Sequence, residues 1–429
     1  MIKESIMIKR LLFLVLCFII SSNYATAREE ESFTSHSSLT LPVPGWGLTF
    51  GNSERTNGIR FNFVDDHVEM VNGFNFTFWK PGKNPDFKMH GISLALVGAT
   101  FDETWGVNSA GGMISGNNFT GINTVGGVLA GNDVTGINVA GGVLAGDDFR
   151  GISVAGVVMA GNNFTGINTA GAVLAGDNFS GINTTGAVMA GDNFNGINAA
   201  GAVMAGDNFS GINVSGGVMA GNSFRGVSVA GGVLAGDSFS GINVAGGVMA
   251  GEDFSGINTV GGVMAGRDIT GVNTSGIVMV GENITGINMA GFGIVGREIT
   301  GINMAGIGMA GDSFVGINMA GAGIGFKLKD HTGHYVGADE IVGFTYGTLG
   351  IGGREIRGVG IAGGVIWCDE FTGLGVGTVQ RMKTEMSGLS IGLLNMTKHL
   401  NGVQIGLINY VKDNPRFLRI LPVINFNFR

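Results

Sequence analysis

The sequence of 429 residues has little cysteine, proline or charge. It contains 2 cysteines and 6 prolines, and 13% of its residues are charged. So few prolines, without a strict Gly-X-Y period, exclude collagen. Low charge combined with 44% hydrophobic residues is the reverse of the composition of a disordered chain. The chain therefore has apolar surface to bury.

Positive charge and long apolar runs are also scarce. Lys and Arg total 24 against 32 Asp and Glu, which gives a net charge of −8. Nucleic acid and anionic lipid are poor partners for such a chain. After the N-terminal segment, no uninterrupted apolar stretch reaches the roughly 18 residues that a transmembrane helix needs.

The first 27 residues have the three parts of an export signal. Lys9 and Arg10 form a positive segment, residues 11–20 (LLFLVLCFII) an apolar segment, and residues 25–27 (ATA) a small-x-small cleavage site. The alternative interpretation is a retained membrane anchor, although this apolar segment is too short to cross a bilayer as a helix. Cleavage after Ala27 would remove one of the two cysteines, so that no intrachain disulfide could form.

Glycine is the residue in excess, and it marks a repeat. The chain contains 81 glycines among its 429 residues, whereas roughly 7% is average. From Gly106 to Gly316 a glycine-led unit restarts every 15 residues, with fifteen starts and no slip in phase. Weaker copies extend the series back to Gly58 and forward to Gly402. One insertion, of 12 residues, interrupts the series before Gly343.

The repeat divides the chain into parts. The predicted parts are a signal peptide at residues 1–27, an N-terminal cap at 28–57, a 15-residue-repeat β domain at 58–413 with an insertion at about 327–340, and a C-terminal cap at 414–429. Caps are expected because a stack of strands exposes an unpaired edge at each end. Both predicted caps contain prolines, which suit such edges.

Within one unit, such as GINTAGAVLAGDNFS at residues 166–180, glycine recurs every fifth residue. The β-branched residues between the glycines favour extended backbone, and no helical period is present. We expect short strands joined by tight bends, with glycine allowing the bends or a close approach of backbone.

Three positions of the unit form columns along the chain. The third position is Asn in thirteen of the fifteen regular units, the ninth is always a long apolar residue, and the fourteenth is mostly aromatic. Like residues at one fixed spacing are typical of in-register parallel stacking, in which amides and aromatic rings form ladders. The sequence therefore predicts an all-β fold, a parallel β-solenoid with one 15-residue unit per coil.

An antiparallel arrangement is the alternative. Residues 59–63 (IRFNF) and 74–78 (FNFTF) alternate apolar and polar side chains, as the strands of an outer-membrane β-barrel do. If each unit were one strand and one turn, the chain would be an antiparallel β-meander or such a barrel. Against this, all the turns look alike, whereas barrels alternate short turns with long loops.

Several segments resemble a known family. Residues 388–397 (GLSIGLLNMT), 402–410 (GVQIGLINY), 421–428 (LPVINFNF) and 57–64 (NGIRFNFV) are similar to the bacterial "surface repeat-containing" protein family, whose repeats follow the pattern G-[LV]-Q-[IL]-G-L-[VI]-N. The central units depart from that pattern and are similar to pentapeptide repeats. The resemblance implies an exported, surface-associated β-repeat protein without catalytic residues.

Chemistry-bearing clusters are scarce in the sequence. All six histidines lie outside the regular units, and no nucleophile, phosphate-loop or zinc motif is present. His331 and His334 in the insertion suggest a metal site only weakly, and a solvent-exposed loop explains them better. Acidic residues at the twelfth and thirteenth positions suggest calcium, but Asn and Arg interrupt the twelfth column. We therefore predict no catalytic, cofactor or metal site.

These observations predict a function without catalysis. We expect an exported, surface-associated structural or interaction protein that contacts an unidentified partner at the cell surface or in the envelope. The alternative is an outer-membrane β-barrel with a channel or anchoring role. Outer-membrane association is thus part of the prediction, and nucleic acid is not an expected partner.

Overall fold

The computed structural model shows an all-β chain. It describes residues 38–43, 46–82, 84–325 and 338–428, so the predicted signal peptide lies outside the described residues. The chain divides into two compact units, residues 1–205 and residues 206–429. Both units are parallel β-solenoid, with about 24 turns in all at a spacing of about 15 residues.

Unit 1 begins with strands of varied length and continues with regular coils. The first strands are β1 (Ser38–Val43), β2 (Trp46–Gly51), β3 (Arg55–Asn62), β4 (Met70–Thr77), β5 (Lys88–Ala95), β6 (Gly98–Ala110) and β7 (Met113–Val125). The regular eight-residue strands are β9 (Asp133–Ala140), β11 (Asp148–Ala155), β13 (Asn163–Ala170), β15 (Asn178–Thr185) and β17 (Asn193–Ala200). Three-residue strands alternate with them: β8 (Val128–Ala130), β10 (Val143–Ala145), β12 (Val158–Ala160), β14 (Val173–Ala175), β16 (Val188–Ala190) and β18 (Val203–Ala205).

Unit 2 continues the regular coils and ends in longer strands. Its eight-residue strands are β19 (Asn208–Ser215), β21 (Ser223–Ala230), β23 (Ser238–Ala245), β25 (Asp253–Val260), β27 (Asp268–Ser275), β29 (Asn283–Ala290), β31 (Glu298–Ala305) and β33 (Ser313–Ala320). The short strands are β20 (Val218–Ala220), β22 (Val233–Ala235), β24 (Val248–Ala250), β26 (Val263–Ala265), β28 (Val278–Val280), β30 (Gly293–Val295), β32 (Gly308–Ala310) and β34 (Gly323–Ile324). The last strands are β35 (Ala338–Gly347), β36 (Gly350–Ile391), β37 (Leu394–Thr397), β38 (His399–Val411) and β39 (Ile420–Asn427).

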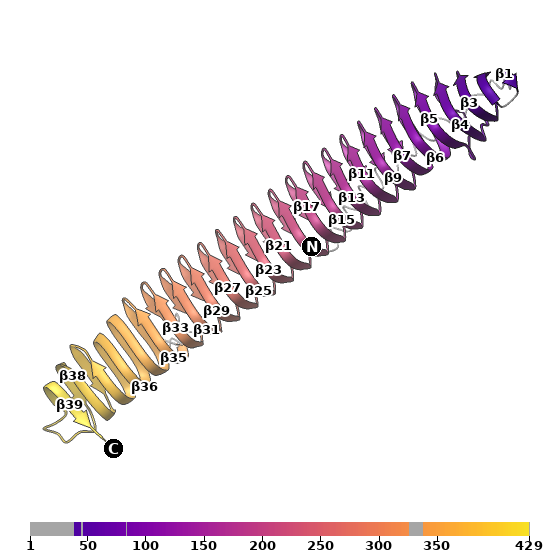
Figure 1. Cartoon of the computed structure of the whole chain (residues 1–429). Coiled ribbons are helices and arrows are strands. Elements are labelled where there is room, and N and C mark those ends of the chain that lie inside the picture. Colours follow the sequence, from indigo (N-terminus) through magenta and orange to yellow (C-terminus); the bar gives the residue numbers. More distant parts are fainter. Residues whose placement is uncertain (1–37, 44–45, 83, 326–337, 429) are drawn as a thin grey trace, which may run out of the picture. The chain divides into compact units, whose positions relative to one another are not determined.

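Successive coils pair in parallel and in register. In unit 1, β13 pairs with β15 so that Asn163 faces Asn178 and each following residue faces the one 15 positions on (Figure 1). The same register relates β29 and β31 in unit 2. The prediction of a parallel β-solenoid is therefore confirmed, and the antiparallel alternative is wrong. The barrel alternative fails with it, because outer-membrane barrels are built from antiparallel strands.

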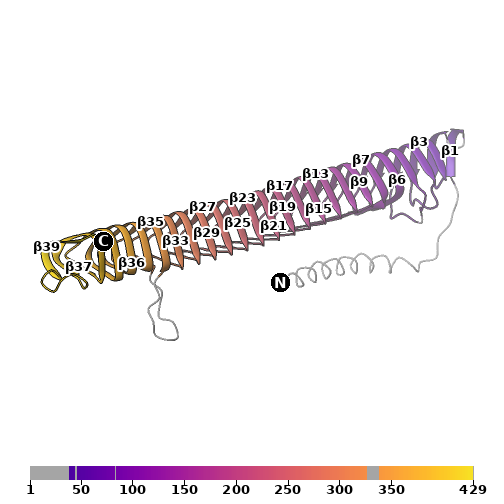
Figure 2. The ribbon, with the colours of Figure 1, turned by 90° about the horizontal axis from the view of Figure 1, so that it is seen from below.

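Each regular coil consists of one long and one short strand rather than three equal segments. In β13 the burial alternates along the strand, with Phe164, Asn168 and Ala170 inside. Leu174 in β14 completes the core of this coil. The core of each regular coil thus has four columns, at the third, fifth, ninth and fourteenth positions. The sequence analysis predicted three of them and did not single out the alanine at the fifth position. Figure 2, turned by 90°, shows the ribbon winding through the successive coils of each unit.

Glycine has two separate roles in the coil. Gly166 lies inside β13 with φ +111°, and a Cβ there would overlap the carbonyl oxygen of Gly151 in the preceding coil. The long strand therefore runs through this glycine, where five-residue segments bounded by bends were predicted. A Cβ on Gly176 would lie 2.5 Å from Cε2 of Phe164, so this glycine makes room for the aromatic column.

The aromatic column forms continuous stacks inside each unit. In unit 1 the rings of Phe149 and Phe164 have centroids 5.0 Å apart and planes inclined by 3°. In unit 2 the rings of Phe209 and Phe224 are 4.7 Å apart and inclined by 1°. The in-register pairing imposes this spacing, because adjacent parallel strands lie about 4.8 Å apart.

Antiparallel strands occur at the two ends of the described chain. β1 pairs antiparallel with β2, and β39 pairs antiparallel with β38. The insertion does not disturb the stack: residues 326–337 lie outside the described residues, but the backbone N–H of Ala338 donates to the Gly325 carbonyl at 3.0 Å. β33 then pairs with β35 in register, with Gly316 facing Gly343.

Candidate functional site

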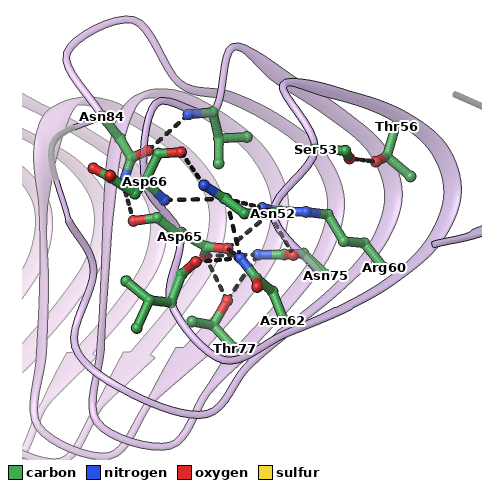
Figure 3. Close-up of polar contacts among 12 residues, drawn as sticks. Asn52, Ser53, Thr56, Arg60, Asn62, Asp65, Asp66, Asn75, Thr77 and Asn84 are labelled. Carbon is green, nitrogen blue, oxygen red and sulfur yellow. Dashed lines mark hydrogen bonds and ion pairs between the residues drawn. The ribbon is translucent and has the colours of Figure 1, made fainter. Parts of the chain in front are cut away.

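Unlike polar side chains gather inside the first coils of unit 1. We call this group the N-terminal polar cluster; it is drawn in Figure 3. Its members are Asn52, Arg60, Asn62, Asp65, Asn75, Thr77 and Asn84. Arg60 and Asn75 occupy the third position of their coils, where the regular units carry asparagine.

Arg60 lies at the centre of the cluster. Its side chain is fully buried, and Nη1 lies 2.7 Å from Oδ1 of Asp65, itself 1% exposed. Nη1 also donates to Oδ1 of Asn75 at 3.1 Å, and Nη2 donates to Oδ1 of Asn52 at 2.9 Å. The guanidinium is thus held by one charged and two neutral acceptors on three different coil segments.

The Asp65 carboxylate accepts further hydrogen bonds besides the one from Arg60. Its carboxylate receives hydrogen bonds from Asn62 Nδ2 at 3.1 Å, from Asn75 Nδ2 at 3.2 Å and from the hydroxyl of Thr77. Asn84 Nδ2 donates to the Asp65 backbone carbonyl at 2.7 Å. This bond attaches the loop between β4 and β5 to the loop that carries Asp65. A buried carboxylate needs such partners because its desolvation is costly.

The electrostatics of the cluster are those of a closed ion pair. Burial lowers the pKa of the Arg60 guanidinium from its ordinary value, and the Asp65 carboxylate acts in the opposite direction. Both charges face each other inside the protein, where neither can meet a dissolved substrate. The arrangement therefore connects the segments that follow β2, β3 and β4 to the first coils.

The sequence pattern missed this cluster. Its one signal was Arg60 at a position that is otherwise Asn or Ser in the regular units, since a charge in a core column demands a counter-charge. Asp65 could not be assigned as that partner, because the loops that carry Asp65 and Asn84 do not repeat.

The third-position asparagines form a buried ladder. Asn108 Nδ2 donates to Asn123 Oδ1 at 2.8 Å, and Asn123 donates to Asn138 in the same way. Ser153 interrupts the ladder: Asn138 Nδ2, the Ser153 hydroxyl and Asn168 Oδ1 have no hydrogen-bond partner. The ladder resumes where Asn168 Nδ2 donates to Asn183 Oδ1 at 2.9 Å.

The acidic columns do not gather into a cation site. Asn162 Nδ2 donates to Asp147 at 3.1 Å and Asn163 Nδ2 to Asp148 at 2.7 Å, so an amide follows the carboxylate at this point of each column. Elsewhere carboxylates are consecutive, as at Asp177, Asp192 and Asp207. Within the described ranges, no group of three or more His, Cys, Asp or Glu side chains is close enough to hold a metal ion. The prediction that no metal site exists stays a prediction.

The insertion adds little that can be placed. His331 and His334 lie outside the described residues. Glu340, at the end of the predicted insertion, forms an ion pair with Arg357 at 3.4 Å. This carboxylate is therefore already engaged by a cation from the next coil.

One shallow hollow of about 240 Å³ lies on the outer side of β11, β13 and β15. Arg150 lines it, but this cation is paired with Asp148 at 2.9 Å and with Asp133 at 3.5 Å. The other lining side chains are members of the regular columns. The hollow is therefore part of the repeated surface of these coils.

Comparisons with known proteins were made for the whole chain. No protein-family model matches it, and neither the curated proteins nor the solved structures contain a match. Similarity to the surface repeat-containing family therefore stays a prediction. Across the residues that the structure places, no helix has both the length and the apolarity to cross a membrane.

Proposed function

We propose that the protein is an exported, surface-associated structural or interaction protein without catalytic activity. One observation carries this proposal: similar outward side chains, above all the second-position isoleucines, recur at the same place in coil after coil of each unit. A contact made by one coil can be made again by its neighbours. Many weak, identical contacts then add up to firm attachment through effective concentration.

The chemistry of the described residues supports a role without catalysis. A reaction needs unlike groups held close together at a place that substrate can reach. The Arg60–Asp65 pair of the N-terminal polar cluster is buried, and exposed ion pairs such as Arg150 with Asp148 lie on the regular columns. The exposed columns repeat a few residue types, such as isoleucine or valine at the second position, which suits adhesion or support better than reaction.

Export and surface location rest on the sequence. The segment at residues 1–27 has the order of charges, apolar residues and small residues of a signal peptide. Similarity of residues 388–397 and 402–410 to the surface repeat-containing family points to the cell surface or the outer membrane. The partner there is unidentified, and the net charge of −8 disfavours nucleic acid.

Protease shaving of intact cells tests the proposal. We expect added protease to degrade the protein while a cytoplasmic marker in the same cells stays intact. An Ala27→Lys variant, which blocks the predicted cleavage site, is expected to remain unprocessed and protected. Protection of the unaltered protein in intact cells, together with its recovery in the cytoplasmic fraction, would contradict the proposal.

A further inference from the structure

The outer side of unit 1 carries an uncharged face. Eleven coils of unit 1 start at a glycine with positive φ, from Gly47 to Gly196; Gly51 also has positive φ but starts no coil. The face consists of the second and fourth residues of these coils. We call it the unit 1 face. Each of these positions holds an apolar residue, a threonine or a serine, and none holds a charge. The pairing keeps both columns in register from coil to coil.

The face is open to solvent although it is apolar. The second-position isoleucines Ile137, Ile167 and Ile182 are 43–44% exposed. Toward the N-terminal end aromatic residues replace the threonines: Phe50 and Phe61 are 47% and 39% exposed, and their rings stack with centroids 5.8 Å apart. Contiguous apolar patches of this kind are uncommon on monomers and mark interfaces.

The area is sufficient for a stable interface. Eleven coils at about 4.8 Å and strand segments of five residues at about 3.3 Å give a surface of roughly 50 by 16 Å. That is about 800 Å², the area that one partner contributes to an interface of standard size.

We propose that a second copy of this chain covers the unit 1 face. The two columns repeat at the strand spacing, and a second copy presents the same apolar columns at the same spacing. Isoleucines of one sheet can therefore fit between residues of the other at every coil, as in sheet-on-sheet packing about 10 Å apart. A globular partner has no reason to match this period.

Charge sets the orientation of the two copies. Acidic side chains such as Asp148 and Asp177 flank the face on the side of the twelfth and thirteenth positions. The sixth and seventh positions on the other flank carry no charge: in the coils that start at Gly106 to Gly196 they hold glycine, alanine or, once, valine, as in Gly171 and Ala172. A two-fold axis parallel to the columns places the acidic flank of one copy beside the uncharged flank of the other. It also brings the aromatic coils of the two copies together. The proposal does not depend on export.

Sedimentation equilibrium of the protein purified from its cells tests the proposal. We expect a dimer at micromolar concentration. Ile167→Lys combined with Ile182→Lys buries two charges in the interface and is expected to raise the dimer Kd about 100-fold or more. The matched control is Asn132→Lys combined with Asn162→Lys, which adds the same charge on exposed positions of the twelfth column and is expected to leave Kd unchanged.

A second double variant, with smaller changes, keeps the test valid if the lysine variant fails to fold. Ile167→Thr with Ile182→Thr keeps β-branched residues that already occur on this face, and is expected to weaken the dimer without altering the circular dichroism spectrum. A monomeric unaltered chain at 100-fold higher concentration, or a lysine variant that is folded and still dimeric, would overturn the proposal. So would flotation of a monomeric chain with neutral phosphatidylcholine vesicles, because lipid would then be the occupant.

Discussion

At the scale of single residues, the role of a side chain is set by the residue 15 positions away. An asparagine at the third position donates to the next asparagine of its ladder, as Asn168 does to Asn183. Arg60 occupies the same column at the N-terminal end and requires Asp65 instead. Each column therefore tolerates substitution only as far as its neighbours can accept the change.

The buried ion pair gives the first prediction. Asp65→Asn leaves the Arg60 guanidinium buried without its counter-charge and is expected to lower the free energy of unfolding by about 3–5 kcal/mol. Glu69→Gln is the control, because the Arg55–Glu69 pair is as short, 2.6 Å, but exposed, and its loss is expected to cost less than about 1 kcal/mol. Urea unfolding curves measure both, and equal losses would contradict the assignment.

The interruption of the asparagine ladder at Ser153 gives the second prediction. Ser153→Asn is expected to supply the missing acceptor for Asn138 and the missing donor for Asn168. Two buried hydrogen bonds are worth about 1–2 kcal/mol of unfolding free energy. Thr165→Asn introduces the same residue on the exposed side of β13 and should change stability by less than about 0.5 kcal/mol. A destabilised Ser153→Asn variant in thermal or urea unfolding would show that the column cannot accept an amide there.

Asp268 gives a prediction about pH. The Asn283 amide, which donates to it at 2.6 Å, and then Arg267 lower the pKa of its carboxyl from the ordinary 3.8. Because the folded chain favours the carboxylate, this contribution to stability is present above pH 3.8 and is lost as the pH falls through the lowered value. An NMR titration of the carboxyl carbon should show Asn283→Ala raising the pKa toward 3.8, whereas Asn178→Ala leaves it unchanged. A carboxyl that titrates normally in the unaltered chain would refute this.

At the scale of the strand, the first glycine of each coil decides whether a long strand can form. Gly241 has φ +100°, and a Cβ there would overlap the Gly226 carbonyl oxygen. Gly241→Ala is therefore expected to cost about 2 kcal/mol or more. At Gly247 the nearest atom to an added Cβ is 3.1 Å away, and coils of unit 1 carry alanine at this position, as at Ala172. Gly247→Ala should therefore cost less than about 1 kcal/mol, and equal thermal shifts for the two variants would exclude this account.

The predictability of the fold also differs from strand to strand. The regular coils could be predicted because fifteen aligned units expose the buried columns directly, among them the asparagines and Phe164. The extent of β13 could not be predicted in this way. Glycine at the first position favours a bend in isolation, but pairing with the coils on both sides holds it within the strand. The N-terminal polar cluster could not be predicted either, because its loops occur only once and so form no column of aligned residues.

At the scale of the molecule, each unit is stabilised by contacts between neighbouring coils. Its stability is then close to a sum of coil and neighbour terms, as in other repeat proteins. Cys368 contributes no cross-link: it is a buried free thiol, and burial raises the pKa of that thiol. Packing and backbone hydrogen bonds along the stack therefore carry the fold, and all of them presuppose parallel pairing in register.

Distances between spin labels in neighbouring coils test that pairing most directly. In a chain with Cys17→Ser, one variant carries labels at Asn163→Cys and Asn178→Cys, and a second at Ala172→Cys and Ala187→Cys; Cys368 stays unlabelled because it is buried. Parallel coils place both pairs at equivalent positions of adjacent coils, about 4.8 Å apart, the first pair on strands and the second in the bends between strands. Both variants should therefore show strong dipolar coupling. In an antiparallel arrangement only one of the two pairs could be adjacent. Strong coupling in one variant and none in the other would contradict the parallel solenoid.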